Sequence, residues 1–461
     1  MNHNSTETIC ALSTPPGVGG IAVIRISGFE ALDIAEKLFS KKIDTAPSHK
    51  ALHGWIMDGD ERVDEVVLTV FRAPRSFTGE MTVEITCHGS IYIQQRIIEL
   101  LLRKGAKMAG PGEFTMRAYL NGRMDLSQAE AVGDLIAAES SAAHKQAIHQ
   151  MRGGFSKEIN DLREKLIHFA SMVELELDFA EEDVEFANRD QLTLLIAEIK
   201  SVVDKLRSSF KLGNAIKNGV PVAIVGAPNM GKSTLLNALL NEDRAIVSDI
   251  AGTTRDTVED SITLGGMRFK FIDTAGIRDT TDTIEQLGIK RSMAKVGEAS
   301  IVLILFDASF EDIDEVKAFI QKVKSSVQQG AQVVLVANKK DKTQRKENDI
   351  AALLSSNDDL VLISAKEGIG VEQLKEKLQS YVSLGAVESG DTIVTNIRHY
   401  EALTLAAQAL MDVQIGLENQ VTGDFLAVDI RKSLFHLSDI LGQINADDLL
   451  NSIFSKFCIG K

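Results

Sequence analysis

A phosphate-binding motif in the middle of the chain constrains the fold more than any other segment. Residues Gly226-Ala-Pro-Asn-Met-Gly-Lys-Ser233 match the pattern G-x-x-x-x-G-K-[ST], and the apolar run Pro221-Val-Ala-Ile-Val225 before them predicts a strand. In such a loop, backbone N–H groups surround the phosphates, the lysine contacts the outer phosphates and the serine hydroxyl binds Mg2+. The motif therefore predicts a strand, a loop and a helix arranged around a nucleotide.

Further motifs follow in a fixed order, and each one ends a predicted strand. They are Asp273-Thr-Ala-Gly276 after Arg268-Phe-Lys-Phe-Ile272, Asn338-Lys-Lys-Asp341 after Val333-Val-Leu-Val-Ala337, and Ser364-Ala-Lys366 after Leu360-Val-Leu-Ile363. A carboxylate such as Asp341 accepts two N–H donors from guanine, whereas adenine presents an acceptor at one of those positions. Asn-Lys-x-Asp alone would usually be a solvated loop, but the ordered set predicts that the nucleotide is GTP.

Length and composition indicate a globular protein of a reducing compartment. The 461 residues suffice for about three domains, and apolar runs such as Ile301-Val-Leu-Ile-Leu-Phe306 are too short to span a bilayer. The first residues lack the basic and apolar regions of a signal peptide. The three cysteines, Cys10, Cys87 and Cys458, are widely separated and lack the spacing of a metal site. We therefore expect a cytoplasmic protein.

The formal net charge of −15 argues against a protein that coats nucleic acid through bulk electrostatics, although a local basic site is compatible with it. The most acidic stretch, Glu174 to Glu185, carries seven carboxylates and no lysine or arginine. It is typical of a solvated helix end and loop. A docking surface for a basic partner is the alternative.

Hydrophobic periodicity divides the chain into three kinds of sequence. Residues 216–382 alternate strands with helices, which predicts a doubly wound α/β domain. Residues 121–215 and 383–461 have apolar positions three and four apart, which predicts helices. Neither helical half could cover its apolar faces alone, so we expect one helical domain that is interrupted by the 216–382 domain. Residues 1–120 predict an α+β domain.

Six strings outside the nucleotide motifs are more specific. They are Thr14-Pro-Pro-Gly17, Arg25-Ile-Ser-Gly28, Ser76-Phe-Thr-Gly-Glu80, Pro111-Gly-Glu-Phe-Thr115, Leu120-Asn-Gly-Arg-Met-Asp-Leu-Ser-Gln-Ala-Glu130 and the ending Phe457-Cys-Ile-Gly-Lys461. Together they resemble the MnmE family of tRNA-modification GTPases, also called TrmE. A generic GTPase would match only the middle third of the chain, whereas this resemblance covers all of it.

The resemblance implies a fold, a reaction and partners. The fold joins an N-terminal α+β domain, similar to tetrahydrofolate-binding modules and used for dimerisation, to a helical domain with an inserted Ras-like G domain. The reaction adds an aminomethyl-type group, such as carboxymethylaminomethyl, to carbon 5 of the wobble uridine in certain tRNAs. A tetrahydrofolate derivative, in its methylene or formyl form, donates the one-carbon unit. The implied partners are a second copy of the chain and the flavoprotein MnmG, in a heterotetramer or larger complex.

The folate site of the family corresponds to Arg25, Glu84, Arg123 and Lys461 in this sequence. A pterin needs a carboxylate for its N–H edge and a glutamate tail needs cations, so the set is chemically reasonable. Without the resemblance, Arg25 and Glu84 would be interpreted as an ordinary pair on a strand surface. The ending Cys-Ile-Gly-Lys fits neither prenylation class, so no membrane anchor is expected. The resemblance suggests that Cys458 is a catalytic thiol, and a buried structural cysteine is the alternative.

The hydrolytic machinery differs from that of many small GTPases, in which a glutamine after the Asp-x-x-Gly motif orients the attacking water. Here that position is Ile277, whose aliphatic side chain cannot polarise water. The resemblance implies that Glu285 is catalytic and acts through an intervening water. Without it, Glu285 would be interpreted as a charged residue on an exposed loop.

The resemblance also implies two cations beside the phosphates. The expected Mg2+ ligands are Ser233 and Thr254, and the expected K+ ligands are Asn229, Ser248, Ile250 and Thr253. The whole expected GTP site is Asn229, Met230, Gly231, Lys232, Ser233, Thr234, Ser248, Asp249, Ile250, Ala251, Gly252, Thr253, Thr254, Asp273, Thr274, Ala275, Gly276, Asn338, Lys339, Asp341, Ser364, Ala365 and Lys366.

Two other classes of function share the nucleotide motifs. A regulatory or ribosome-assembly GTPase would have the same G domain, but such proteins typically add a basic, aromatic-rich RNA-binding module, and the sequence has no such stretch. A scaffold whose helices hold partners under GTP control is the third possibility.

Overall fold

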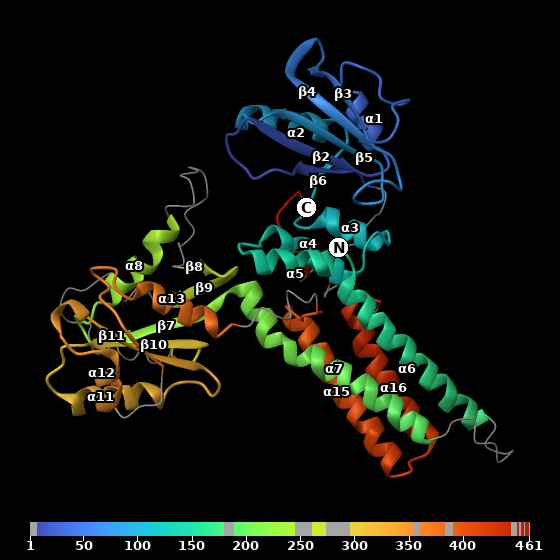
Figure 1. The fold of residues 1–461 in the computed structure, drawn as a ribbon. Coiled ribbons are helices and arrows are strands. Elements are labelled where there is room, and N and C mark those ends of the chain that lie inside the picture. The colour runs from blue at the N-terminus through green and yellow to red at the C-terminus, as the bar shows by residue number, and fades with distance from the viewer. Residues whose placement is uncertain are drawn as a thin grey trace. The chain divides into compact units, whose positions relative to one another are not determined.

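A computed structural model of the chain describes residues 7–178, 189–244, 261–272, 296–354, 359–382, 391–443, 450, 453–455 and 457–460. Its elements are shown in Figure 1. Contacts group the chain into two compact units, one formed by residues 1–136, 147–203 and 402–461 and the other by residues 137–146 and 204–401. The domain boundaries expected from the sequence remain a prediction.

A six-stranded sheet forms the centre of the second unit. Its strands are β7 (Val220–Gly226), β8 (Ser261–Leu264), β9 (Met267–Ile272), β10 (Ile301–Asp307), β11 (Gln332–Asn338) and β12 (Asp359–Leu362). They lie in the order β12-β11-β10-β7-β9-β8, and all neighbours are parallel except the hairpin of β8 and β9. Strands β12, β11, β10 and β7 therefore end at one edge, where sheets of this class bind ligands.

Helices cover both faces of this sheet (Figure 1). They are α8 (Lys232–Arg244) and α13 (Val371–Ser380) on one face, and α11 (Ile313–Lys324) and α12 (Glu347–Leu354) on the other. Successive residues of β7 point to opposite faces, so Ile224 belongs to the first hydrophobic core and Val225 to the second. Strand β10 is apolar along nearly its whole length because both of its faces are buried. The doubly wound α/β domain predicted from the sequence is confirmed.

Helical segments extend the core of the second unit. Helices α5 (Ser141–Met151), α7 (Arg189–Asn218) and α15 (Ile397–Glu418) contribute residues to both units. Ala142, Ile216 and Ile393 belong to the same hydrophobic core as the sheet. Gly213 permits this packing, because a Cβ there would lie 2.0 Å from the carbonyl oxygen of Val394. The parts of α5 and α7 that belong to the second unit, and Ile393 before α15, therefore pack against the sheet.

The N-terminal residues form a second six-stranded sheet. Its strands are β1 (Ile9–Leu12), β2 (Ile21–Ser27), β3 (Lys50–Asp58), β4 (Glu61–Phe71), β5 (Thr82–His88) and β6 (Lys107–Met108), in the order β3-β4-β5-β2-β1-β6. Helices α1 (Ala31–Glu36) and α2 (Ile91–Arg103) cover one face, where Val66 and Leu68 are buried. Val67, on the opposite face, is 40% exposed. The α+β domain predicted from the sequence is confirmed.

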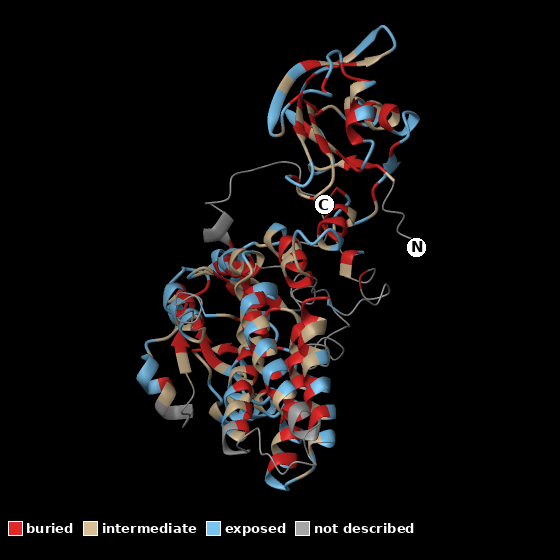
Figure 2. Cartoon of the chain, turned by 90° about the vertical axis from the view of Figure 1, so that its right-hand side faces the viewer, coloured by how far each residue is buried: buried red, intermediate tan, exposed pale blue. Residues whose placement is uncertain are grey.

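The remaining helices of the first unit are α3 (Glu113–Leu120), α4 (Leu126–Ile136), α6 (Gly154–Asp178) and α16 (Gly423–Ile440). Buried and exposed residues alternate along the long helices in Figure 2, and α6 and α16 have the burial pattern of amphipathic helices, whereas five consecutive residues of α3 are buried. Helix α6 packs along α16, and Arg163 Nε donates to Ser438 Oγ across this contact at 2.8 Å. None of the helices in the described part of the chain is long and apolar enough to cross a membrane.

Candidate functional site

The phosphate-binding motif connects β7 to α8. Helix α8 begins at Lys232, so its first backbone N–H groups face the loop, as an anion site requires. Gly226 lies against β10, where a Cβ would be 2.6 Å from the carbonyl oxygen of Leu305. Gly231 has a φ of 91°, and a Cβ there would lie 2.4 Å from Asn338 Nδ2. The first and last glycines of the motif are thus required by the local geometry.

Lys232 lies inside this loop. Its Nζ donates hydrogen bonds to the carbonyl oxygens of Gly226 at 2.7 Å and Ala227 at 3.0 Å. Burial lowers the pKa of Lys232. Ser233 and Thr234 follow in the first turn of α8. The ammonium group therefore already occupies the loop that would surround the phosphates.

A buried amide joins three segments that are distant in the sequence. Asn338, at the end of β11, is 3% exposed. Its Nδ2 donates to the carbonyl oxygen of Met230 in the phosphate loop at 2.8 Å, and its Oδ1 accepts from the backbone N–H of Ala365 after β12 at 2.9 Å. The phosphate loop, the Asn-Lys-x-Asp motif and the Ser-Ala-Lys motif are thus brought together at the carboxyl edge of the sheet.

Asp341 lies in the short 3-10 helix Lys340–Lys342 beside these segments. The hydroxyl of Ser364 donates to Asp341 Oδ1 at 2.6 Å, and this hydrogen bond lowers the pKa of Asp341. The carboxylate is therefore charged and held in one orientation. Lys366, by contrast, is 80% exposed and contacts only the neighbouring Glu367 in the described structure, at 3.4 Å.

Asp307 is a residue of this site that the sequence interpretation missed. It ends β10, and its Oδ2 accepts from Lys339 Nζ at 2.8 Å, while Lys339 itself has the left-handed φ of 65°. Burial alone would raise the pKa of Asp307, but hydrogen bonds from Lys339 and Ser309 outweigh it and lower the pKa. The signal in the sequence was an acidic residue at the end of an apolar strand.

Several expected nucleotide-site residues lie outside the described residues. They are Ser248, Asp249, Ile250, Ala251, Gly252, Thr253, Thr254, Asp273, Thr274, Ala275, Gly276 and Glu285. Asn229 is described and has a φ of 60°, a left-handed conformation that asparagine tolerates better than most residues. Its side chain makes no hydrogen bond with the part of the chain that the structure describes.

A second candidate site lies on the N-terminal sheet. Arg25 on β2 is directly opposite Glu84 on β5, and the two side chains are 15% and 26% exposed. Arg25 Nε and Nη2 both contact Glu84 Oε1, at 2.9 and 2.8 Å. Glu84 Oε2 makes no hydrogen bond with the residues described. The Arg25 guanidinium also lies 5.3 Å from the ring centre of Phe77 and 5.5 Å from that of Phe114.

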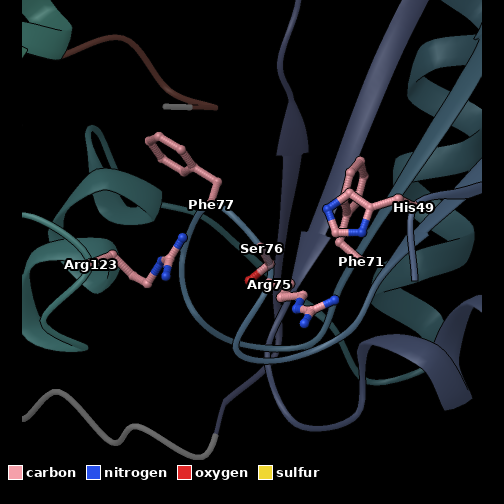
Figure 3. Close-up of a pocket in the computed structure, with 6 residues that line it drawn as sticks. All are labelled: His49, Phe71, Arg75, Ser76, Phe77 and Arg123. Carbon is pink, nitrogen blue, oxygen red and sulfur yellow. The ribbon is translucent and has the colours of Figure 1, made fainter. Parts of the chain in front are cut away.

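A cavity of about 330 Å³ adjoins this pair (Figure 3). It is lined by His49, Phe71, Arg75, Ser76, Phe77 and Arg123. Phe77 contacts Arg25 and also lines the cavity with Arg123, so it connects the Arg25–Glu84 pair to the cavity. Lys461, the fourth expected residue of this site, lies outside the described residues.

The C-terminal tail packs against the N-terminal domain. Ile459 pairs with Pro111, the backbone N–H of Gly112 donates to the carbonyl oxygen of Cys458 at 3.4 Å, and Ser13 Oγ donates to the carbonyl oxygen of Gly460 at 3.1 Å. Cys458 is exposed, so it is not the buried structural cysteine that was the alternative interpretation.

The other two cysteines are poorly suited to act as nucleophiles. Burial raises the pKa of Cys10 to about 12. Burial, together with the nearby charge of Asp64, raises the pKa of Cys87 to about 11. Because only the thiolate is strongly nucleophilic, both are unreactive near neutral pH.

In GTPases, one parallel strand ends in a phosphate loop and another ends in an Asn-Lys-x-Asp motif. This chain has the same arrangement at the ends of β7 and β11. Two family models cover most of the chain: the GTP-binding protein TrmE N-terminus matches residues 8–123, and the MnmE helical domain matches residues 126–458. The chain belongs to the MnmE family of tRNA-modification GTPases.

Two relatives that match nearly the full chain agree with this assignment. The tRNA modification GTPase MnmE of Christiangramia forsetii is 53% identical, over 99% of each chain. That of Cytophaga hutchinsonii is 55% identical, over 99% of this chain and 98% of the relative. Among solved structures, Aquifex aeolicus Era bound to GDP and AlF4− is 27% identical over 41% of this chain and 66% of that chain, with a TM-score of 0.27.

Proposed function

We propose that this chain hydrolyses GTP during tRNA modification and, with a flavoprotein partner, adds an aminomethyl-type group to carbon 5 of the wobble uridine in certain tRNAs. Relatives more than 50% identical over nearly their full length are tRNA modification GTPases, which supports the general activity. The single observation that carries the nucleotide site is the buried amide of Asn338, which joins the phosphate loop to the segments expected to bind the base.

In this proposal Mg2+ is held by Ser233 and Thr254, and K+ by Asn229 with Ser248, Ile250 and Thr253. The left-handed backbone of Asn229 and its side-chain amide, which makes no hydrogen bond with the described residues, fit an ion ligand. When bound, K+ supplies positive charge where negative charge develops between the phosphates during hydrolysis. Glu285 orients the attacking water through a second water, because Ile277 cannot.

Hydrolysis is expected to be at least about tenfold faster in KCl than in NaCl at equal ionic strength. Replacing Asn229 with alanine removes one ligand of the ion, so the Asn229→Ala variant should hydrolyse GTP at the same rate in both salts. Phosphate release at saturating GTP measures this. Asn237→Ala, which truncates an exposed asparagine of α8, is the control and should keep the potassium effect. Equal rates in the two salts for the wild type would refute the potassium assignment.

We also propose that the N-terminal domain binds a tetrahydrofolate derivative through Arg25, Glu84, Arg123 and Lys461. Arg25 fixes one oxygen of Glu84, which leaves Oε2 to accept hydrogen bonds from the N–H edge of a pterin. Phe77 and Phe114 provide apolar surface beside it, and Arg123 is a cation for the acidic tail. The residues therefore fit the group. When bound, the folate supplies the one-carbon unit, and the exposed Cys458 is the thiol proposed to act near it.

Gly460→Ala is expected to detach the C-terminal tail and weaken folate binding. Gly460 has a φ of 98°, and a Cβ there would lie 2.1 Å from the carbonyl oxygen of Leu12, a backbone atom that cannot move freely. Loss of the Lys461 charge from the site should lower folate affinity about tenfold. Titration calorimetry with tetrahydrofolate measures the change.

Gly59→Ala is a matched control for Gly460→Ala. Gly59 also has a positive φ, of 63°, but has open space around it. Unchanged affinity in Gly460→Ala would show that the tail is not part of the site.

The remaining elements of the proposal are the partners and the location. We propose a homodimer formed through the N-terminal domain, in a complex with the flavoprotein MnmG. Exposed apolar side chains on the face of the N-terminal sheet opposite α1 and α2 support dimerisation, because Ile21 and Val67 are 66% and 40% exposed there. The need for tRNA and folate supports a cytoplasmic location.

Reconstitution tests the whole function. Purified chain, flavoprotein, tRNA, GTP and methylene-tetrahydrofolate should yield modified wobble uridine in the presence of K+, and omission of K+ should suppress it. Nucleoside analysis of a deletion strain is the complementary test. Unchanged modified uridine in that strain would refute the proposal and favour a regulatory or ribosome-assembly GTPase.

A further inference from the structure

The cavity of the N-terminal domain contains two arginines whose charges the described residues do not neutralise. Arg75 and Arg123 both line it, and neither side chain forms a hydrogen bond or ion pair with a described residue. Three other arginines of the domain form ion pairs, Arg25 with Glu84, Arg96 with Glu99 and Arg117 with Glu113. Two more contact other groups: Arg62 lies over the ring of Trp55, and Arg72 donates to the carbonyl oxygen of Ala46. Two uncompensated guanidinium groups at one cavity indicate that its ligand is an anion.

One loop holds both arginines in place. The backbone N–H of Arg75 donates to the carbonyl oxygen of Arg72 at 2.8 Å, and the next residue, Ser76, is buried and donates from Oγ to the carbonyl oxygen of Glu80 at 2.6 Å. The stem of Arg123 packs against Gly79 of the same loop, where a Cβ would lie 3.2 Å from Arg123 Cγ. In Figure 3 the two guanidinium groups lie on either side of Ser76. The fold thus sets the backbone positions from which the two arginine side chains extend.

Aromatic rings form the other walls. His49 and Phe71 make an edge-to-face contact with ring centres 5.3 Å apart, and Phe77 connects the cavity to Arg25. A volume of about 330 Å³ is at the small end of ligand pockets, which span roughly 300 to 1,000 Å³. The cavity therefore suits the carboxylate-bearing end of an aromatic ligand whose remaining part lies beyond Phe77, beside Arg25 and Glu84.

We propose that this cavity binds the acidic tail of the folate and that Arg75 selects folates that carry more than one glutamate. The inference rests on the proposed folate site. Arg123 binds the first glutamate, and Arg75 binds a carboxylate further along the γ-linked chain. Each added glutamate brings another carboxylate, so a second cation at the same cavity favours the longer tail.

Binding of three ligands to the full-length chain tests this inference. They are formyl-tetrahydrofolate with three glutamates, the same compound with one glutamate, and formyl-tetrahydropteroate, which has none. The wild type should bind the triglutamate about tenfold more tightly than the monoglutamate. Arg75→Gln should lose that preference and should bind the tail-less pteroate as the wild type does. Arg103→Gln is the control, because it removes the same charge from an exposed position on α2 and should leave all three affinities unchanged.

The possible failures are distinguishable. Equal affinity of the wild type for one and three glutamates would overturn the role of Arg75. An Arg75→Gln variant that loses affinity for the pteroate as much as for the triglutamate would overturn it as well, because the residue would then be structural. A wild type that binds none of the three compounds would refute the folate site itself, and this inference with it.

Discussion

Replacing Asp341 with asparagine is expected to lower the affinity for GTP at least about a hundredfold. The carboxylate can accept two N–H donors from the guanine edge, whereas an amide offers one oxygen and places an NH2 donor against the other guanine N–H. Ser364 already orders the Asp341 side chain through its hydroxyl. The variant therefore keeps a fixed side chain with the wrong hydrogen-bonding pattern.

The same substitution should raise the affinity for xanthosine triphosphate, which has a carbonyl where guanine has its amino group, so that the new amide can donate to it. Competition binding with the two nucleotides measures both changes. Glu372→Gln is the control, because it removes an equal charge from a side chain that is 74% exposed on α13. A variant that loses affinity for GTP without gaining any for xanthosine triphosphate would show that Asp341 is structural.

Much of the nucleotide site could be predicted from the sequence because its chemistry requires particular residues at strand ends. Strands β7 and β11, which precede two of these motifs, are largely buried on both faces and are continuous apolar runs in the sequence, so they were expected within two residues of their observed bounds. Strand β3 was missed. Lys50–Asp58 lies at the edge of its sheet, contains a glycine and has a register shift between Ile56 and Met57, so apolar and polar residues do not alternate regularly.

Contacts between distant residues could not be predicted from spacing. Asp307 and Lys339 are 32 positions apart, and only the parallel pairing of β10 with β11 brings their strand ends together. The pairing of Arg25 with Glu84 similarly depends on the register of β2 and β5. The resemblance to a family identified these two residues. That Phe77 contacts Arg25 and also lines the cavity, and that Arg75 has no partner among the described residues, is visible only in the folded domain.

A largely buried ion-pair network connects two of the strings that carry the family resemblance, Ser76–Glu80 and Pro111–Thr115. Arg117 is 10% exposed, and it donates to Glu113 Oε1 at 2.8 Å, to Glu80 Oε1 at 3.3 Å and to the carbonyl oxygen of Glu7 at 2.8 Å. Glu80 also accepts from Ser27 Oγ at 2.7 Å. One arginine thus joins helix α3 to the loop that holds Arg75 and Arg123. Its loss should therefore affect the stability of the whole N-terminal domain.

Arg117→Met is expected to lower the free energy of unfolding of this domain by about 3 kcal/mol, because it leaves Glu80 and Glu113 largely buried without a counter-charge. Trp55, the only tryptophan of the chain, lies in β3, so its fluorescence during denaturant unfolding reports on this domain separately from the others. Arg103→Met, at an ion pair whose arginine side chain is 56% exposed, should leave the unfolding midpoint nearly unchanged.

Adding Glu80→Gln to Arg117→Met should restore part of the stability, because one unpaired charge is removed. If Arg117→Met destabilises the domain no more than Arg103→Met does, the network does not support the domain. If the double variant recovers nothing, the loss comes from packing rather than from unpaired charge.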